Sequence, residues 1–154
     1  MSSFTIWTDS REKKGFKFHR YPVDTEEKRL KTGDYCVKGD GRMIGDTEFD
    51  PHYVVERKSG KDFLNSITWS RDRFEDELAR ADSMARRMPI VVSKPWKYFT
   101  DERYHKNVHI NSIIGTIETH PQIYNVEYFW NRDRVKAEQL TYEFLKYRNE
   151  TLQR

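Results

Sequence analysis

The sequence contains little cysteine and no long apolar run. Cys36 is the only cysteine among 154 residues, so an intramolecular disulfide is excluded and the chain suits a reducing compartment. The start, MSSFTIWTDS, lacks the basic flank and apolar core of a signal peptide, and no segment has the length of a membrane span. We therefore expect a protein without membrane contact that is not secreted and is cytoplasmic, or nuclear in a eukaryote.

Internal repeats, low-complexity tracts and interdomain linkers are absent as well. This predicts a single domain over residues 1–154. Hydrophobic residues make up 36% of the chain and charged residues 34%, which is polar for a globular domain. Aromatic residues nevertheless reach 14%, so the chain can form one continuous core.

The net charge is only +3, but its distribution is uneven. Between Arg11 and Lys31 there are eight Lys or Arg and four Asp or Glu, a local charge of +4, so the rest of the chain sums to −1. A basic segment beside a balanced body suits a surface that meets a phosphate backbone, here through Lys13, Lys14 and Lys17. A solvated basic loop is the alternative interpretation.

The apolar patterns predict strands first, then alternating helices and strands. Strands are expected at 4–8, 35–38, 53–57, 89–93 and 123–130. Helices are expected over 70–87, 108–121 and 132–152, the last two capped by Asn107 and Asn131. The segment 11–32 is expected to be mostly loop, and 39–57 a hairpin or meander. This order predicts an α/β fold with a mixed central sheet flanked by helices.

Two charged residues close an apolar run and suggest metal-dependent chemistry. Glu56 and Lys58 are two residues apart, so on a strand they project to the same side. Asp34, in the turn TGDY, can supply a second carboxylate from a neighbouring strand. Hydrolysis of a phosphodiester near neutral pH uses cations that activate water and neutralise the leaving oxygen, and Mg²⁺ prefers such oxygen ligands. An Asp…Glu-x-Lys array is typical of Mg²⁺ nucleases, although Glu-x-Lys alone occurs by chance in most proteins.

Several linked motifs make the pattern more specific. TGDY and ERKSGKD resemble the G-D…E-R-K-x-x-x-D signature of XPF-type structure-specific endonucleases, the family of XPF and archaeal Hef. TDSRE resembles the family's D-x-R-E, and DFLNSI, SRDRFEDEL and PIVVS follow in the family's order. The similarity covers about residues 4–148. It implies a restriction-endonuclease-like fold and Mg²⁺-dependent cleavage, with Mn²⁺ as a substitute. The implied substrate is flapped or branched DNA, cut near its junctions in repair, recombination or replication.

The resemblance also implies roles for individual residues. The implied catalytic set is Asp9, Asp34, Glu56, Arg57 and Lys58. Within it, Asp34 and Glu56 bind the metal together with Asp9, Lys58 acts at the water, and Arg57 contacts the phosphate or an adjacent carboxylate.

Further positions are expected to surround this set. The resemblance implies that Glu12 borders the pocket and that Asp62 holds Arg57 or Lys58, with a helix N-cap as the alternative for Asp62. Its implied contacts with the DNA backbone are Arg11 and either Arg71 or Arg73. A solvated helix face is the alternative for Arg73.

Two departures from the larger family members affect the expected context. A short extended passage around Gly15 follows D-x-R-E in place of a helix, which resembles compact, stand-alone bacterial and phage versions of the domain and suggests a bacterial or phage-infected cell. No helix-hairpin-helix module or helicase accompanies the domain in this sequence, so we expect an accessory DNA-binding protein. Two alternatives stay open: a non-catalytic DNA-binding subunit of a nuclease heterodimer, and a nuclease of the wider superfamily that cuts duplex DNA or RNA.

The C-terminal helix carries more apolar residues than one buried stripe requires. We expect Val135, Leu140, Phe144 and Tyr147 to face inward. Tyr142 and Leu145 would then form a second apolar face, which predicts a homodimer through this helix. The alternative is that the small sheet packs this helix on two sides.

Overall fold

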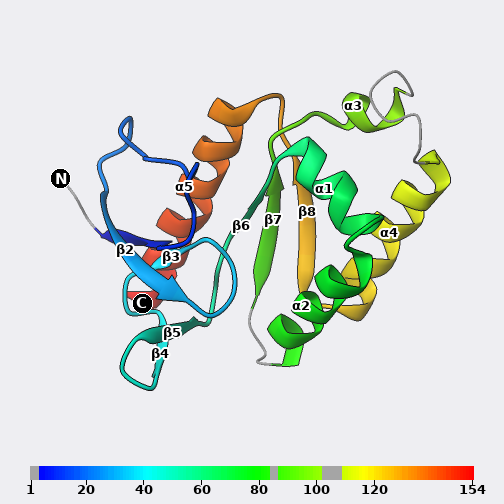
Figure 1. Cartoon of the computed structure of the whole chain (residues 1–154). Coiled ribbons are helices and arrows are strands. Elements are labelled where there is room, and N and C mark those ends of the chain that lie inside the picture. The colour runs from blue at the N-terminus through cyan, green and yellow to red at the C-terminus, as the bar shows by residue number, and fades with distance from the viewer. Residues whose placement is uncertain (1–3, 84–86, 102–108) are drawn as a thin grey trace.

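The computed structural model describes residues 4–83, 87–101 and 109–154, and its core is a mixed sheet in two parts (Figure 1). The larger part has the strand order β3-β1-β2-β5-β4, and the smaller part the order β6-β7-β8. A single bridge between Tyr35 and Val55 joins the edge strand β3 to the chain just before β6. The predicted α/β fold with a mixed sheet between helices is therefore confirmed.

The larger part contains both parallel and antiparallel neighbours. Its strands are β1 (Thr5–Asp9), β2 (Asp24–Leu30), β3 (Tyr35–Val37), β4 (Gly41–Ile44) and β5 (Glu48–Pro51). Strand β1 is parallel to β2 and antiparallel to β3, and β4 and β5 form the expected hairpin. The prediction of loop over 11–32 was wrong for β2. Its sequence, DTEEKRL, is almost entirely polar because its side chains are exposed except at the half-buried Lys28 and the buried Leu30. The strand is therefore held by backbone pairing rather than by apolar alternation.

The smaller part is entirely parallel and lies between helices on both faces. Its strands are β6 (Glu56–Lys58), β7 (Met88–Val92) and β8 (Val126–Trp130). All residues of β7 are buried, as is typical of a central parallel strand. Ile90 and Val92 face the core beneath the helices α1 and α2, whereas Val91 faces the core beneath the last helix.

Four helices pack against one face of this parallel sheet or extend from it, and the fifth covers the other (Figure 1). They are α1 (Gly60–Ile67), α2 (Arg71–Ser83), α3 (Trp96–Thr100), α4 (Ile110–Ile123) and α5 (Arg134–Leu152). The expected caps differ from those observed: His109 caps α4 and Asp133 caps α5, while Asn131 donates its side-chain amide to the carbonyls of β7 and β8. Asn107 lies outside the described residues. Pro121 lies within α4 rather than ending it.

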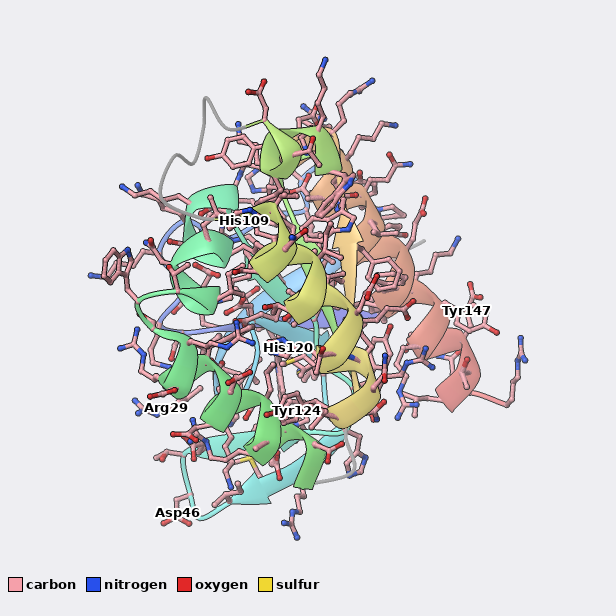
Figure 2. All side chains as sticks on the ribbon, turned by 90° about the vertical axis from the view of Figure 1, so that its right-hand side faces the viewer. Arg29, Asp46, His109, His120, Tyr124 and Tyr147 are labelled. Atoms are coloured by element: carbon pink, nitrogen blue, oxygen red, sulfur yellow. The ribbon has the colours of Figure 1, made fainter. Side chains whose placement is uncertain are left out.

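The expected inner face of α5 was wrong for Val135 and Tyr147, whereas Leu140 and Phe144 are half-buried and pack against the core. Val135 and Tyr147 are 44% and 64% exposed, and Figure 2 shows Tyr147 on the outer side of the helix. The buried side chains are instead Ala137, Thr141, Tyr142, Leu145 and Asn149. The small side chains of Ala137 and Thr141 let the helix approach the sheet closely. The ring of Tyr142 stacks on the ring of Tyr21 in the N-terminal segment, with 4.4 Å between the ring centres. Tyr142 and Leu145 therefore belong to the core and leave no second apolar face of the kind expected.

Across residues 4–83, 87–101 and 109–154, no helix combines the length and apolar character that a bilayer crossing requires.

Candidate active site

The join between the two parts of the sheet brings Asp34 and Glu56 together. The N–H groups of Asp34 and Tyr35 both donate to the Val55 carbonyl, at 3.0 and 3.1 Å. The Val55 N–H returns a bond to the Tyr35 carbonyl at 2.8 Å. The backbone N–H of Arg57 then donates to Asp34 Oδ2 at 2.7 Å. These bonds set the carboxylate at the start of β3 beside the first residue of β6.

Gly33 makes this close approach sterically feasible. Its φ is +79°, in the left-handed region that side chains disfavour, and an added Cβ would lie 2.3 Å from a methyl carbon of Val54. The glycine of the TGDY turn is therefore required by both backbone conformation and space. This explains the residue type directly before Asp34.

The two carboxylates repel each other in a site that is withdrawn from water. Burial first, and then the neighbouring Glu56 carboxylate, raise the pKa of Asp34 well above its ordinary value. Glu56 is buried. A proton or a cation between these oxygens would relieve the repulsion, so the pair is built to attract positive charge.

Lys58 lies on the same side of β6 as Glu56, as strand alternation predicts. Its Nζ is 3.6 Å from Glu56 Oε2 and donates to Ser66 Oγ of α1 at 3.1 Å. The ammonium also lies 4.9 Å from the centre of the Phe74 ring of α2. Three neighbours thus hold the amine next to the carboxylates. Ser66 was missed by sequence reasoning, because its role depends on how α1 folds back over β6.

Arg57 points to the opposite side of the strand and pairs with Glu12. Its guanidinium donates to the two Glu12 oxygens at 3.1 and 3.4 Å, and lies 5.9 Å from the centre of the Phe16 ring. The same loop is tied to the sheet by Phe16, whose N–H donates to the Tyr35 hydroxyl at 2.8 Å. Glu12 therefore anchors Arg57 and the N-terminal loop.

Asp9 also borders the site, but its carboxylate already accepts hydrogen bonds from other groups of the chain. Its Oδ1 accepts the N–H of Leu30 at 3.0 Å, and its carboxylate pairs with Arg11 at 3.1 Å. Arg11 thus lies on Asp9, although about half of its side chain stays exposed. Only this exposed part of the Arg11 side chain can make the expected contact with DNA.

A hollow of about 310 Å³ is lined by Asp9, Asp34 and Glu56, but not by Glu12, Arg57 or Lys58. Its lining comprises Asp9, Arg11, Lys31, Thr32, Gly33, Asp34, Glu56, Glu77 and Arg80. Glu77 of α2 was not anticipated from the sequence. Burial, and then Glu56, raise the pKa of Glu77 to about 7, so a further carboxyl group faces the site in a partly protonated form. The spacing of Glu77 from Glu56 along the chain carries no signal for this contact.

The remaining predicted residues lie outside the hollow. Asp62 is exposed in the first turn of α1, where Ser59 and not Asp62 is the N-cap. Arg71 is held inside by Thr116 and Glu75, whereas Arg73 is exposed. The lysines of the N-terminal loop are exposed: Lys13, Lys14 and Lys17.

Comparisons with known proteins agree with this architecture. The model of the ERCC4 domain family matches residues 8–144. XPF from Aeropyrum pernix is similar over 93% of this chain and 60% of its own, with a TM-score of 0.70 and 18% sequence identity. A structure of XPF from Aeropyrum pernix in complex with DNA matches 97% of this chain and 66% of its own, with a TM-score of 0.73 and 18% identity.

No curated protein matches the sequence. The chain spans about three-fifths to two-thirds of the solved chains it matches, and it shares their fold.

Proposed function

The chain belongs to the ERCC4 domain family, and on that premise we propose that it is a Mg²⁺-dependent endonuclease. It hydrolyses DNA phosphodiester bonds near single-strand/double-strand junctions such as flaps and forks. The observation that carries the proposal is the Asp34–Glu56 carboxylate pair with the Lys58 ammonium 3.6 Å from Glu56. The similarity to XPF from Aeropyrum pernix in complex with DNA supports the choice of substrate. Such a substrate would place the protein in the cytoplasm of a bacterial or phage-infected cell, or in a nucleus.

The donor set fits Mg²⁺. Asp34 and Glu56 offer carboxylate oxygens, which Mg²⁺ prefers, and their mutual repulsion favours a cation between them. In the part of the chain that the structure describes, no group of three or more His, Cys, Asp or Glu side chains could hold a metal ion together. Asp34 and Glu56 would therefore share the ion with water and with the substrate, as Mg²⁺ sites commonly do. When bound, the ion supplies positive charge at the scissile phosphate and acidifies its water.

The chain's own residues have separate tasks in this proposal. Lys58 orients the attacking water beside Glu56, since its amine is already fixed by Ser66. Glu12 holds Arg57 at the edge of the N-terminal loop, from where the guanidinium reaches a phosphate or a nearby carboxylate. Asp9 orders the Arg11 side chain and the end of β2. The lysines of the loop provide sequence-independent contacts with the DNA backbone.

The test is cleavage of labelled flap, fork, duplex and single-stranded DNA by purified protein with Mg²⁺. Asp34→Asn and Glu56→Gln should each reduce the rate by about 100-fold or more, because charge stabilisation in the transition state is removed. They should also weaken Mn²⁺ binding, measured by electron paramagnetic resonance. Asp62→Asn is the matched control, since Asp62 is an exposed carboxylate one helical turn from the site.

Near-wild-type cutting by either site variant would refute the assignment of the site. Preferred cutting of plain duplex or of RNA would support a different member of the wider superfamily. DNA binding without any cleavage by the wild type would favour a non-catalytic subunit, against which the complete Asp34, Glu56 and Lys58 set argues.

The proposal extends to protein partners. Because Tyr142 and Leu145 are buried, a homodimer through α5 would have to use its exposed apolar residues Val135, Tyr147 and Leu152. Light scattering at micromolar concentration distinguishes a monomer of 18.7 kDa from a dimer of twice that mass. Tyr147→Glu should dissociate the dimer without unfolding the chain. A monomeric wild type would refute pairing and leave an accessory DNA-binding protein as the proposed partner.

A further inference from the structure

Trp69 is the most exposed large hydrophobic residue in the described part of the chain. The residue is 86% exposed and lies in the turn where α1 meets α2 (Figure 1). Its apolar neighbours in the sequence, Leu64 and Ile67, are buried in the core. The indole is therefore an isolated aromatic surface rather than the edge of an apolar patch.

The surroundings of Trp69 are polar and carry positive charge. A hollow of about 380 Å³ is lined by residues 68–73, among them Arg71, Asp72 and Arg73. Arg71 is turned inward to Thr116, but Arg73 is exposed and forms no hydrogen bond or ion pair with the described residues. A lone exposed aromatic beside an exposed arginine is the arrangement that stacks on a nucleobase and holds its backbone. A protein partner would instead require a contiguous apolar surface.

The position of Trp69 relative to the active site favours the same ligand. On α2, Arg73 precedes Glu77 by one turn and Arg80 follows it, so the three lie on one face. Glu77 and Arg80 line the catalytic hollow. On α1, Ser66 contacts Lys58, and Trp69 follows Ser66 by three residues, a reach of at most about 11 Å between Cα atoms. Both helices therefore lead from the active site to the indole.

We propose that Trp69 stacks on an unpaired or terminal base of the DNA substrate, while Arg73 contacts the adjoining phosphate. The inference rests on the proposed nuclease function and deepens it, since it supplies a contact that distinguishes a junction from plain duplex. Asp72 in the same hollow repels phosphate. The indole is therefore expected to contact the face of a base and not the phosphate backbone.

The test uses fork DNA with 2-aminopurine placed at successive positions from the cut, bound to a Glu56→Gln chain that does not cleave. Stacking should quench the probe at one position. Trp69→Ala should abolish that quench and weaken fork binding by roughly 5- to 100-fold, with little change for plain duplex. Trp69→Phe should retain most of both effects. Arg73→Ala should lower the salt slope of binding by about 0.9.

Ile123→Ala is the matched control, since Ile123 is an exposed apolar residue at the end of α4 and lines neither hollow. Unchanged quenching and affinity in Trp69→Ala, or the same decrease in Ile123→Ala, would overturn the proposal. So would a Trp69→Ala chain that binds forks normally but changes its mass in light scattering, which would assign Trp69 to a protein interface. Cleavage by the wild type is measured separately, so failure of the stacking interaction is distinguishable from failure of the nuclease function.

Discussion

The hydroxyl of Ser66 provides a sensitive test of how Lys58, the proposed catalytic lysine, is positioned. Ser66→Ala removes the acceptor 3.1 Å from Lys58 Nζ and keeps the rest of the buried α1 face. A hydrogen bond to a charged group contributes about 1.5–3 kcal/mol, equivalent to about 10- to 100-fold in rate if it is fully expressed in the transition state. Glu56 and the Phe74 ring still hold the ammonium, at 3.6 and 4.9 Å, so only part of this effect should appear. We expect a decrease of about 5- to 20-fold, well below the effect of removing Lys58 itself.

The assay is single-turnover cleavage of a labelled fork with excess protein and saturating Mg²⁺. A double-mutant cycle with Lys58→Ala isolates the interaction, because Ser66→Ala should have little further effect once the amine is gone. The free energy of unfolding of Ser66→Ala should stay within about 1 kcal/mol of the wild type, which separates positioning from folding. A Ser66→Ala rate within twofold of the wild type, or an undiminished effect in the Lys58→Ala background, would refute the reasoning.

Three further predictions concern DNA binding, packing and pH. Reversing the charge of Lys13, Lys14 and Lys17 should lower the log–log salt slope of duplex binding by about 0.9 for each phosphate that is no longer neutralised. An unchanged slope would identify a solvated loop. Leu145→Ala should reduce the free energy of unfolding by about 2–5 kcal/mol in urea titrations, whereas Tyr147→Ala should change it by less than about 0.5 kcal/mol. Burial lowers the pKa of His120 despite the opposing Glu75 carboxylate, so the folded state prefers the neutral ring. The wild type should therefore lose stability as pH falls below about 6.5, more steeply than His120→Gln, and parallel curves would contradict this.

The strands with apolar patterns could be predicted from the sequence, but strand β2 could not. Strand β7 is buried on both faces and reads as an uninterrupted apolar run. Strand β2 has exposed side chains up to Leu30, so neither alternation nor composition distinguishes it from a charged loop. Its register with β1 and β5 is fixed by backbone hydrogen bonds, which leave no trace in side-chain type.

The orientation of α5 was mispredicted for a related reason. Apolar residues occur around most of its circumference, so periodicity alone allows more than one inner face. The choice is made by tertiary partners that the helix sequence does not contain. Ala137 and Leu145 pack with Val91 of β7 and Phe4 near β1, and Tyr142 meets Tyr21. Large side chains such as Tyr147 are then left at the surface.

The candidate site likewise has features that the sequence predicts and features that it does not. Strand alternation correctly placed Glu56 and Lys58 on one side, because that relation is local. Ser66, Glu77 and the pairing of Arg57 with Glu12 depend on contacts between segments far apart in the chain, so no motif spacing indicates them. The implied role of Asp62 beside Arg57 or Lys58 finds no geometric support, since Glu12 and Ser66 occupy those places.

The site owes its chemistry to its location at the join of the two sheet parts. Asp34 directly precedes the edge strand of one part and Glu56 begins the edge strand of the other, and the Tyr35–Val55 bridge connects those edges. A continuous ladder would have kept neighbouring side chains at ordinary strand spacing, with both carboxylates facing solvent. Here the chain turns sharply at Gly33, and Asp34 receives the Arg57 N–H that would otherwise seek a strand partner. The backbone thus fixes one carboxylate against the other, and the repulsion between them favours a positive charge between the two groups, as the proposed Mg²⁺-dependent hydrolysis would require.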